Sequence, residues 1–182
     1  DWSSDVCSSD LLVKRYVAER KHTVLLCVST GRSMAALNDA AVAKRELTVL
    51  VAGVIGYLAV QHGDLVALVH GDEERHHVER PAAGELHLER LLGTVHDAIT
   101  PDGPHGDLPG LLRHVVRTVR RRTILVVVTD DVTLSDESTM LLRRLTAQHE
   151  VLFLTVGDLD PTQRSVADRR LVDVDEIGRA HV

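Results

Sequence analysis

Aromatic side chains and cysteines are scarce in this sequence. Its 182 residues include one Trp, one Phe, two Tyr and two Cys, and the net charge at pH 7 is −6. Proteins that bind single-stranded nucleic acid combine stacking aromatic residues with a broad basic face. The one basic run, at 117–122, follows a predicted helix, where the backbone dipole favours cations. Composition therefore argues against a nucleic-acid-binding protein.

Long hydrophobic runs and glycine-rich phosphate-binding loops are also missing. No apolar run approaches the roughly 20 residues that a membrane-spanning helix needs. No Gly-rich loop follows a predicted strand, which argues against a dinucleotide or P-loop site. We expect a cytoplasmic domain, and a membrane anchor upstream of residue 1 is compatible with this expectation.

Both ends of the chain are expected to derive from a sequencing adapter. Residues 176–182 back-translate to DNA whose reverse complement encodes residues 4–11. One adapter joined to both ends of a genomic insert explains both stretches, so we exclude 1–11 and 176–182 from the natural protein. Residues 12–175 are expected to form one truncated domain. Its lone cysteine, Cys27, cannot form an intramolecular disulfide, which suits a reducing compartment.

Apolar runs alternate with longer amphipathic segments, which predicts an α/β fold with a mostly parallel central sheet. The expected strands are 23–29, 65–70, 76–79, 123–129 and 151–156, and the expected helices are 40–61, 85–99, 108–119 and 136–148. The continuous apolar runs Ile124–Val128 and Val151–Leu154 indicate strands that are covered on both faces. We expect the apolar residues of Ala40–Val60 to lie in the core.

A small-residue loop follows the first strand directly. The strand ends in Cys27-Val28, and Ser29-Thr30-Gly31-Arg32-Ser33-Met34 follows before a helical segment. In open α/β sheets, ligands bind at the carboxyl ends of strands. The loop resembles the metal-ion loop of von Willebrand A domains, Asp-x-Ser-x-Ser. Ser29 takes the place of the Asp and Gly31 that of the first Ser, and Ser33 is kept.

The order of short motifs over residues 13–160 resembles a bacterial von Willebrand A-like family called domain of unknown function 58. The motifs are Glu19-Arg20-Lys21, Gly31-Arg32-Ser33-Met34, Lys44-Arg45-Glu46-Leu47, Gly63-Asp64-Leu65, Gly106-Asp107-Leu108, Arg120-Arg121-Arg122, Val128-Thr129-Asp130 and His149-Glu150-Val151. The resemblance implies a three-layer, Rossmann-like fold. It also implies a binding module without catalytic residues, associated with MoxR-type AAA ATPases.

The resemblance further implies where a metal site would lie. Its three loops correspond to Ser29, Gly31 and Ser33; to Gly106 beside Asp107; and to Asp130 beside Asp131. The primary carboxylate and two hydroxyl ligands are missing, and Mg²⁺ requires near-octahedral oxygen coordination. Only Ser33 and Asp130 remain as candidate ligands. We therefore expect a degenerate metal site and no cofactor, with Mg²⁺ held weakly if at all.

We predict that the domain binds another protein and has no enzymatic activity. The resemblance alone implies a MoxR-type AAA ATPase as the partner. The predicted contact residues are Ser29, Thr30, Gly31, Arg32, Ser33, Met34, Asp107, Asp130 and Asp131.

A serine hydrolase is the alternative. The segment 31–35 approximates the Gly-x-Ser-x-Gly nucleophile elbow, with Ser33 as nucleophile and Asp130 as the acidic partner of a histidine. Ala35 stands where the elbow favours glycine, and no earlier strand carries an oxyanion loop. His149 precedes its strand, which places it at the opposite edge of the sheet from Ser33. A triad is defined by geometry, and these features argue against one.

Four histidines lie around an acidic turn at Asp72-Glu73-Glu74. They are His70, His76, His77 and His87. Structural zinc sites need four ligands, usually including cysteines at close spacing, and no cysteine lies nearby. His76 and His77 would point to opposite faces of a strand. We expect a solvated edge here and no zinc site.

Overall fold

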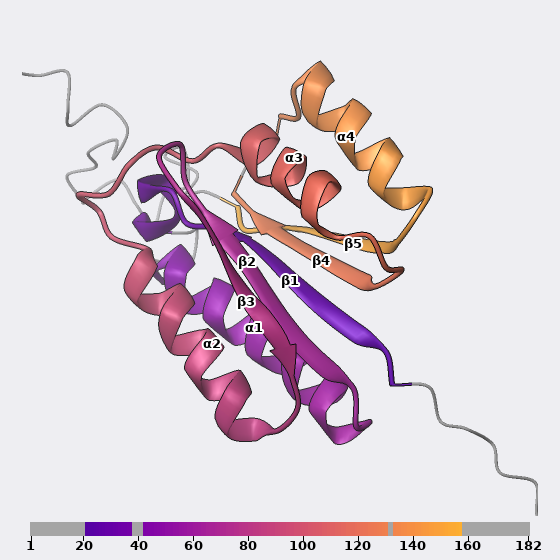
Figure 1. Cartoon of the computed structure of the whole chain (residues 1–182). Helices are drawn as coiled ribbons and strands as arrows, with labels where there is room; N and C mark the ends of the chain where they lie inside the picture. Colours follow the sequence, from indigo (N-terminus) through magenta and orange to yellow (C-terminus); the bar gives the residue numbers. More distant parts are fainter. Residues whose placement is uncertain (1–20, 38–41, 131–132, 158–182) are drawn as a thin grey trace, which may run out of the picture.

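The computed structural model describes residues 21–37, 42–130 and 133–157, which contain a five-stranded sheet (Figure 1). Its strands are β1 (Thr23–Ser29), β2 (Leu65–Gly71), β3 (His76–Ala82), β4 (Ile124–Thr129) and β5 (Glu150–Thr155). Their spatial order is β3-β2-β1-β4-β5. All neighbours are parallel except β2 and β3, which pair antiparallel. The prediction of a mostly parallel sheet is confirmed.

Helices cover both faces of the sheet. They are α1 (Lys44–Gln61), α2 (Glu85–Ala98), α3 (Leu108–Thr118), α4 (Asp136–Thr146) and a short 3-10 helix, η1 (Arg32–Ala35). Figure 1 shows α1 and α2 on one face and α3 and α4 on the other. The three layers predicted from the sequence are therefore present. The adapter-derived ends expected at 1–11 and 176–182 lie outside the described residues.

Strand β1 divides the interior into two cores. Leu26 and Val28 belong to the cluster that packs under α1 and α2, whereas Leu25 and Cys27 belong to the cluster under α3 and α4. This division follows from the two-residue period of a strand, which directs successive side chains to opposite faces. Burial raises the pKa of the Cys27 thiol to about 12. The thiol therefore stays protonated and serves as a small apolar core group.

Two expectations about burial are wrong. The apolar residues of Ala40–Val60 do not all lie in the core, and the strand with the run Val151–Leu154 is not covered on both faces. Helix α1 packs on its neighbours through small residues, and a Cβ atom at Gly56 would lie 2.4 Å from Leu88 Cδ1. Its outer side exposes Leu50, Val54, Tyr57 and Leu58. Strand β5 lies at the edge of the described sheet, so its apolar run is only partly covered and Leu152 is 45% exposed.

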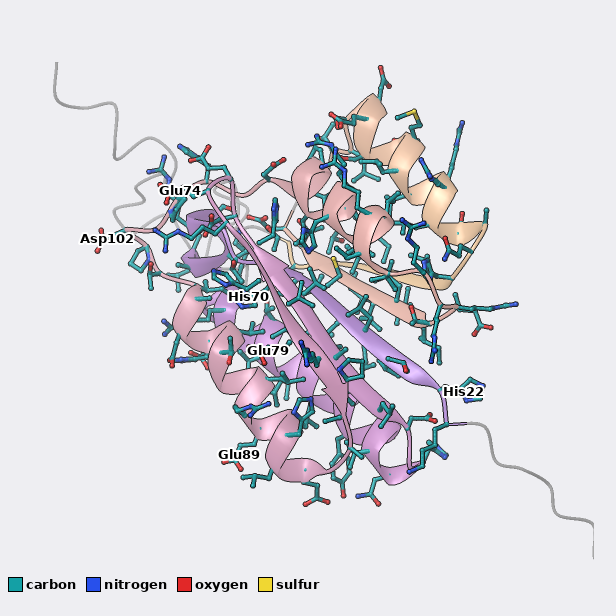
Figure 2. The ribbon with its side chains drawn as sticks, viewed as in Figure 1. His22, His70, Glu74, Glu79, Glu89 and Asp102 are labelled. Atoms are coloured by element: carbon teal, nitrogen blue, oxygen red, sulfur yellow. The ribbon has the colours of Figure 1, made fainter. Side chains whose placement is uncertain are left out.

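Two pairs of stacked imidazoles lie on the β2–β3 hairpin. His70 stacks on His77, with ring centroids 5.2 Å apart, and His76 stacks on His114 of α3 at 5.4 Å. Figure 2 shows His70 on β2 close to Glu79 of the neighbouring strand β3. The expectation of a solvated edge is wrong for His70, which is 6% exposed. In the described part of the chain, no group of three or more His, Cys, Asp or Glu could hold a metal ion.

Burial disfavours the charged form of these imidazoles. It lowers the pKa of His70, and His77 lowers it further, although Glu79 and Asp72 act in the opposite direction. Burial likewise lowers the pKa of His114, with a further contribution from His76. The pKa of His149, which lies at the start of β5, is lowered by burial as well. The folded protein therefore holds these histidines neutral at pH values where the unfolded chain binds protons.

This proton linkage predicts a loss of stability in mild acid. A lowered folded pKa means that the unfolded state binds more protons below about pH 6.5, so the free energy of unfolding should fall as pH decreases. Urea denaturation between about pH 7.5 and 5 measures the slope. His70→Gln should make the slope shallower, because it removes a histidine whose pKa is lowered on folding. A free energy of unfolding that is flat over this range would contradict the prediction.

Candidate functional site

The carboxyl ends of β1 and β4 lie side by side at the centre of the sheet. From β1 the chain continues outward to β2 and β3, and it later returns to add β4 and β5 on the other side of β1. Ligands of open α/β sheets bind at such a switch point, where the loops after two neighbouring strands diverge. Figure 2 shows Glu74 and Asp102 at this end of the sheet and His22 at the opposite end. The structure therefore brings the loops that follow β1 and β4 to one end of the sheet. Here, "this edge" means the edge at the carboxyl ends of β1 and β4.

Backbone hydrogen bonds join the loops at this edge. The loop after β1, the β2–β3 turn and the loop before α3 are linked by Thr30 N–H to Gly71 O (2.9 Å), Arg32 N–H to Pro104 O (2.8 Å) and Glu73 N–H to His105 O (3.0 Å). The Glu73 carboxylate also accepts from the His105 N–H at 3.1 Å. These hydrogen bonds thus hold together three segments that are distant in sequence.

Two glycines allow these loops to touch. A Cβ atom at Gly31 would lie 2.2 Å from the backbone N of Gly106, and one at Gly106 would lie 3.2 Å from Ser29 Oγ. In the motif that the loop resembles, serine and threonine side chains occupy these two positions. A side chain at Gly31 would collide with the backbone of Gly106, which gives a steric reason for that departure from the motif. A side chain at Gly106 would first meet the Ser29 hydroxyl, which is a tight contact and not a backbone collision.

Most of the predicted contact residues in the first loop are not exposed. Ser29 and Thr30 are 3% and 2% exposed, and Met34 is fully buried in the core under α1 and α2. Arg32 and Ser33 are half-buried. The Arg32 guanidinium contacts the imidazole of His105, which lies in the loop before α3. Arg32 and Ser33 are therefore the side chains that this loop presents at the surface.

Asp107 and Asp130 each have an intramolecular partner. Asp107 is the N-cap of α3, and its Oδ1 accepts from the N–H of Gly110 at 2.9 Å. Asp130 Oδ2 lies 2.9 Å from Lys44 Nζ. The structure brings Asp107 and Asp130 to the same edge as the first loop, while the predicted neighbour Asp131 lies outside the described residues.

Lys44 is a site residue that sequence reasoning missed. It begins α1, and its side chain is 1% exposed. Its sequence signal was a lysine within the Lys44-Arg45-Glu46-Leu47 motif, directly before a long apolar stretch of the same helix. Burial of such a long cation requires a charged or polar partner. The sequence could raise that question, but it could not identify Asp130, 86 residues further along the chain, as the partner.

The residues that the structure describes at this edge do not fit Mg²⁺. The ion needs about six oxygen ligands at short distance in a nearly octahedral arrangement. The Asp130 carboxylate, directly after β4, already pairs with the Lys44 ammonium group, and the Asp107 carboxylate caps a helix. The close contact of Gly31 with the backbone of Gly106 leaves no room for a hydroxyl side chain at Gly31. Within 21–37, 42–130 and 133–157, the donor set thus lacks the oxygens that would enclose the ion.

The geometry gives no support to the serine hydrolase alternative. His149 lies at the opposite end of the sheet, as expected, where its Nδ1 accepts from the N–H of Thr123 at 3.3 Å. Among the described residues, no hydrogen bond joins the Ser33 hydroxyl to an imidazole. Asp130 is paired with Lys44 and does not orient a histidine.

The sheet order, the antiparallel edge strand β3 and the loops at the switch point define a von Willebrand A-like domain. The sequence matches the family described as "Protein of unknown function DUF58" over residues 1–178. The chain belongs to this DUF58 family, which confirms the resemblance found in its motifs.

One solved structure with low sequence identity supports this fold. An aerotolerance-related membrane protein from Bacteroides fragilis NCTC 9343 is 14% identical with a TM-score of 0.56, and the match covers 74% of this chain and 67% of that one. The von Willebrand A domain of SpRpn10 is 10% identical with a TM-score of 0.48, and 85% of each chain is covered. No curated protein matches the sequence. Within residues 21–37, 42–130 and 133–157, no helix is long and apolar enough to cross a membrane.

The contact between Gly31 and Gly106 predicts a large effect of a single methyl group. Gly31→Ala should lower the free energy of unfolding by about 3 kcal/mol, the upper part of the range for overpacking, because the new Cβ meets rigid backbone. Gly93→Ala is the matched control. It lies inside α2 with nothing within 4 Å of a new Cβ, so it should be neutral or stabilise by up to about 1 kcal/mol. Urea denaturation of both variants measures the difference, and equal effects would contradict the prediction.

Proposed function

We propose that this domain is a non-catalytic protein-interaction module and that its contact surface is the edge at the carboxyl ends of β1 and β4. The observation that carries the proposal is which partners the polar side chains at this edge have. Asp130 pairs with Lys44, Asp107 caps α3, and the Ser33 hydroxyl has no imidazole partner in the described residues. Such groups can support a shaped surface, but they do not form a nucleophile with its base.

Arg32 is the recognition group that we assign to this surface. Its guanidinium lies beside His105, and its backbone N–H is fixed to the carbonyl of Pro104 at 2.8 Å. A planar guanidinium held on a rigid loop is suited to bidentate binding of a carboxylate. We therefore propose that the partner offers an Asp or Glu side chain to Arg32.

A MoxR-type AAA ATPase is the partner that we propose. The support is membership in DUF58 together with the von Willebrand A-like fold. The domain would act in the cytoplasm as an accessory to the ATPase. The printed description of the Bacteroides fragilis structure as a membrane protein is compatible with a domain held at a membrane by other parts of its chain.

Charge reversal at the edge tests this proposal. Arg32→Glu should weaken binding of a co-encoded MoxR-type ATPase by at least about tenfold. The new carboxylate would repel the Asp or Glu side chain that the Arg32 guanidinium is proposed to bind. Biolayer interferometry with immobilised domain measures the dissociation constant in the presence and absence of ATP. The matched control is Arg144→Glu, which makes the same charge change at an exposed position in the last turn of α4.

Two outcomes would contradict the proposal in different ways. Equal affinity of the parent and Arg32→Glu would show that the contact surface lies elsewhere on the domain. Failure of the parent to bind the ATPase would remove the ATPase as partner.

A further inference from the structure

The Lys44 side chain is a buried cation at the edge where von Willebrand A domains hold a metal ion. Its Nζ lies 2.9 Å from Asp130 Oδ2, and the two side chains are 1% and 13% exposed. An ammonium group loses most of its hydration when it is buried to this degree, and only a close anionic partner compensates the loss. The pair is therefore a structural element of the edge, unlike an ion pair on the surface.

The backbone of Lys44 is tied to the first loop as well. Its N–H donates to Ala36 O at 2.8 Å, just after η1, and an isolated bridge joins Leu37 to Ala43. Its carbonyl accepts from the Thr48 hydroxyl at 2.8 Å, which holds the first turn of α1. Lys44 thus connects the segment that follows β1 with Asp130, which follows β4.

A divalent ion at this edge would have the same two roles as Lys44. It would neutralise the carboxylate after β4 and hold the loops after β1 and β4 together through shared oxygen ligands. In this chain the carboxylate already has a cation at hydrogen-bonding distance, and that cation is covalently part of α1. The contact of Gly31 with the backbone of Gly106 leaves no room for a ligand side chain at Gly31.

We infer that the ammonium group of Lys44 replaces the metal ion, so that the edge is held by a resident cation and forms without a divalent ion. This inference concerns the same surface as the proposed function. It rests only on the Lys44–Asp130 contact and the packing of the loops, and stability measurements on the protein alone can test it. Its failure is therefore distinguishable from the failure of partner binding.

A double-mutant cycle on the full chain tests the pair itself. Lys44→Met keeps most of the apolar stem, Asp130→Asn keeps the shape of the carboxylate, and the cycle compares both with the double variant. We expect a coupling of at least about tenfold in the unfolding equilibrium constant, equivalent to about 1.4 kcal/mol. The control cycle is Arg113→Met with Glu137→Gln, an ion pair of 2.7 Å whose side chains are 42% and 47% exposed. Its coupling should stay below about fivefold. Equal coupling in the two cycles would overturn the inference.

A metal titration is a second test, and its main result comes from the unaltered protein. The thermal midpoint should be the same in EDTA and in millimolar MgCl₂ or MnCl₂ at matched ionic strength, because a ligand that binds only the folded state must raise the midpoint. A rise with Mn²⁺ or Mg²⁺ that Asp130→Asn abolishes would show that this edge holds a divalent ion beside Lys44, and it would overturn the inference. A rise that Asp130→Asn retains would assign the ion to another site, and the edge would remain independent of it.

Discussion

The packing of β1 on both faces and along both edges is the constraint on which the other elements depend. Leu26, Cys27 and Val28 are fully buried, and parallel strands β2 and β4 flank β1. A strand in this position needs an apolar side chain at every step, and each face needs its own helical layer. The chain must also leave β1 on one side and return on the other, which produces the switch point. The location of the candidate site therefore follows from the burial of one seven-residue strand.

The sequence was a good guide to features that depend on local pattern. The bounds of β1 could be predicted, and the structure confirms them. The N-cap at Ser135 and the glycine after α1 are local features of the same kind. The Ser135 hydroxyl accepts from the N–H of Ser138 at 3.1 Å, and Gly63 has φ +78°. Each of these depends on side-chain period or on backbone geometry within a few residues.

The features that failed depend on contacts that are distant in sequence. The apolar run of β5 is the same whether a strand lies inside a sheet or at its described edge, so Leu152 could not be identified as exposed. Helix α1 is apolar on most sides, so its sequence alone does not identify the side that packs on the core. In the structure this is the side that carries the small residues. Likewise, the partner of Lys44 and the neighbour of Gly31 are set by tertiary packing. The candidate edge could be predicted, but its internal chemistry could not.

A covalently attached cation gives this edge properties that a bound metal would not. A metal ion can keep an open coordination position, through which a partner's carboxylate joins the site. Lys44 has three N–H donors on a side chain that is 1% exposed, so its charge stabilises the loops from within and does not reach a partner. Recognition must then use groups at the surface, of which Arg32 beside His105 is the cationic one in the first loop. Under the proposals made above for Lys44 and Arg32, such an edge would be formed before the partner arrives. Its affinity would then depend on guanidinium–carboxylate chemistry and would be independent of the supply of divalent ions.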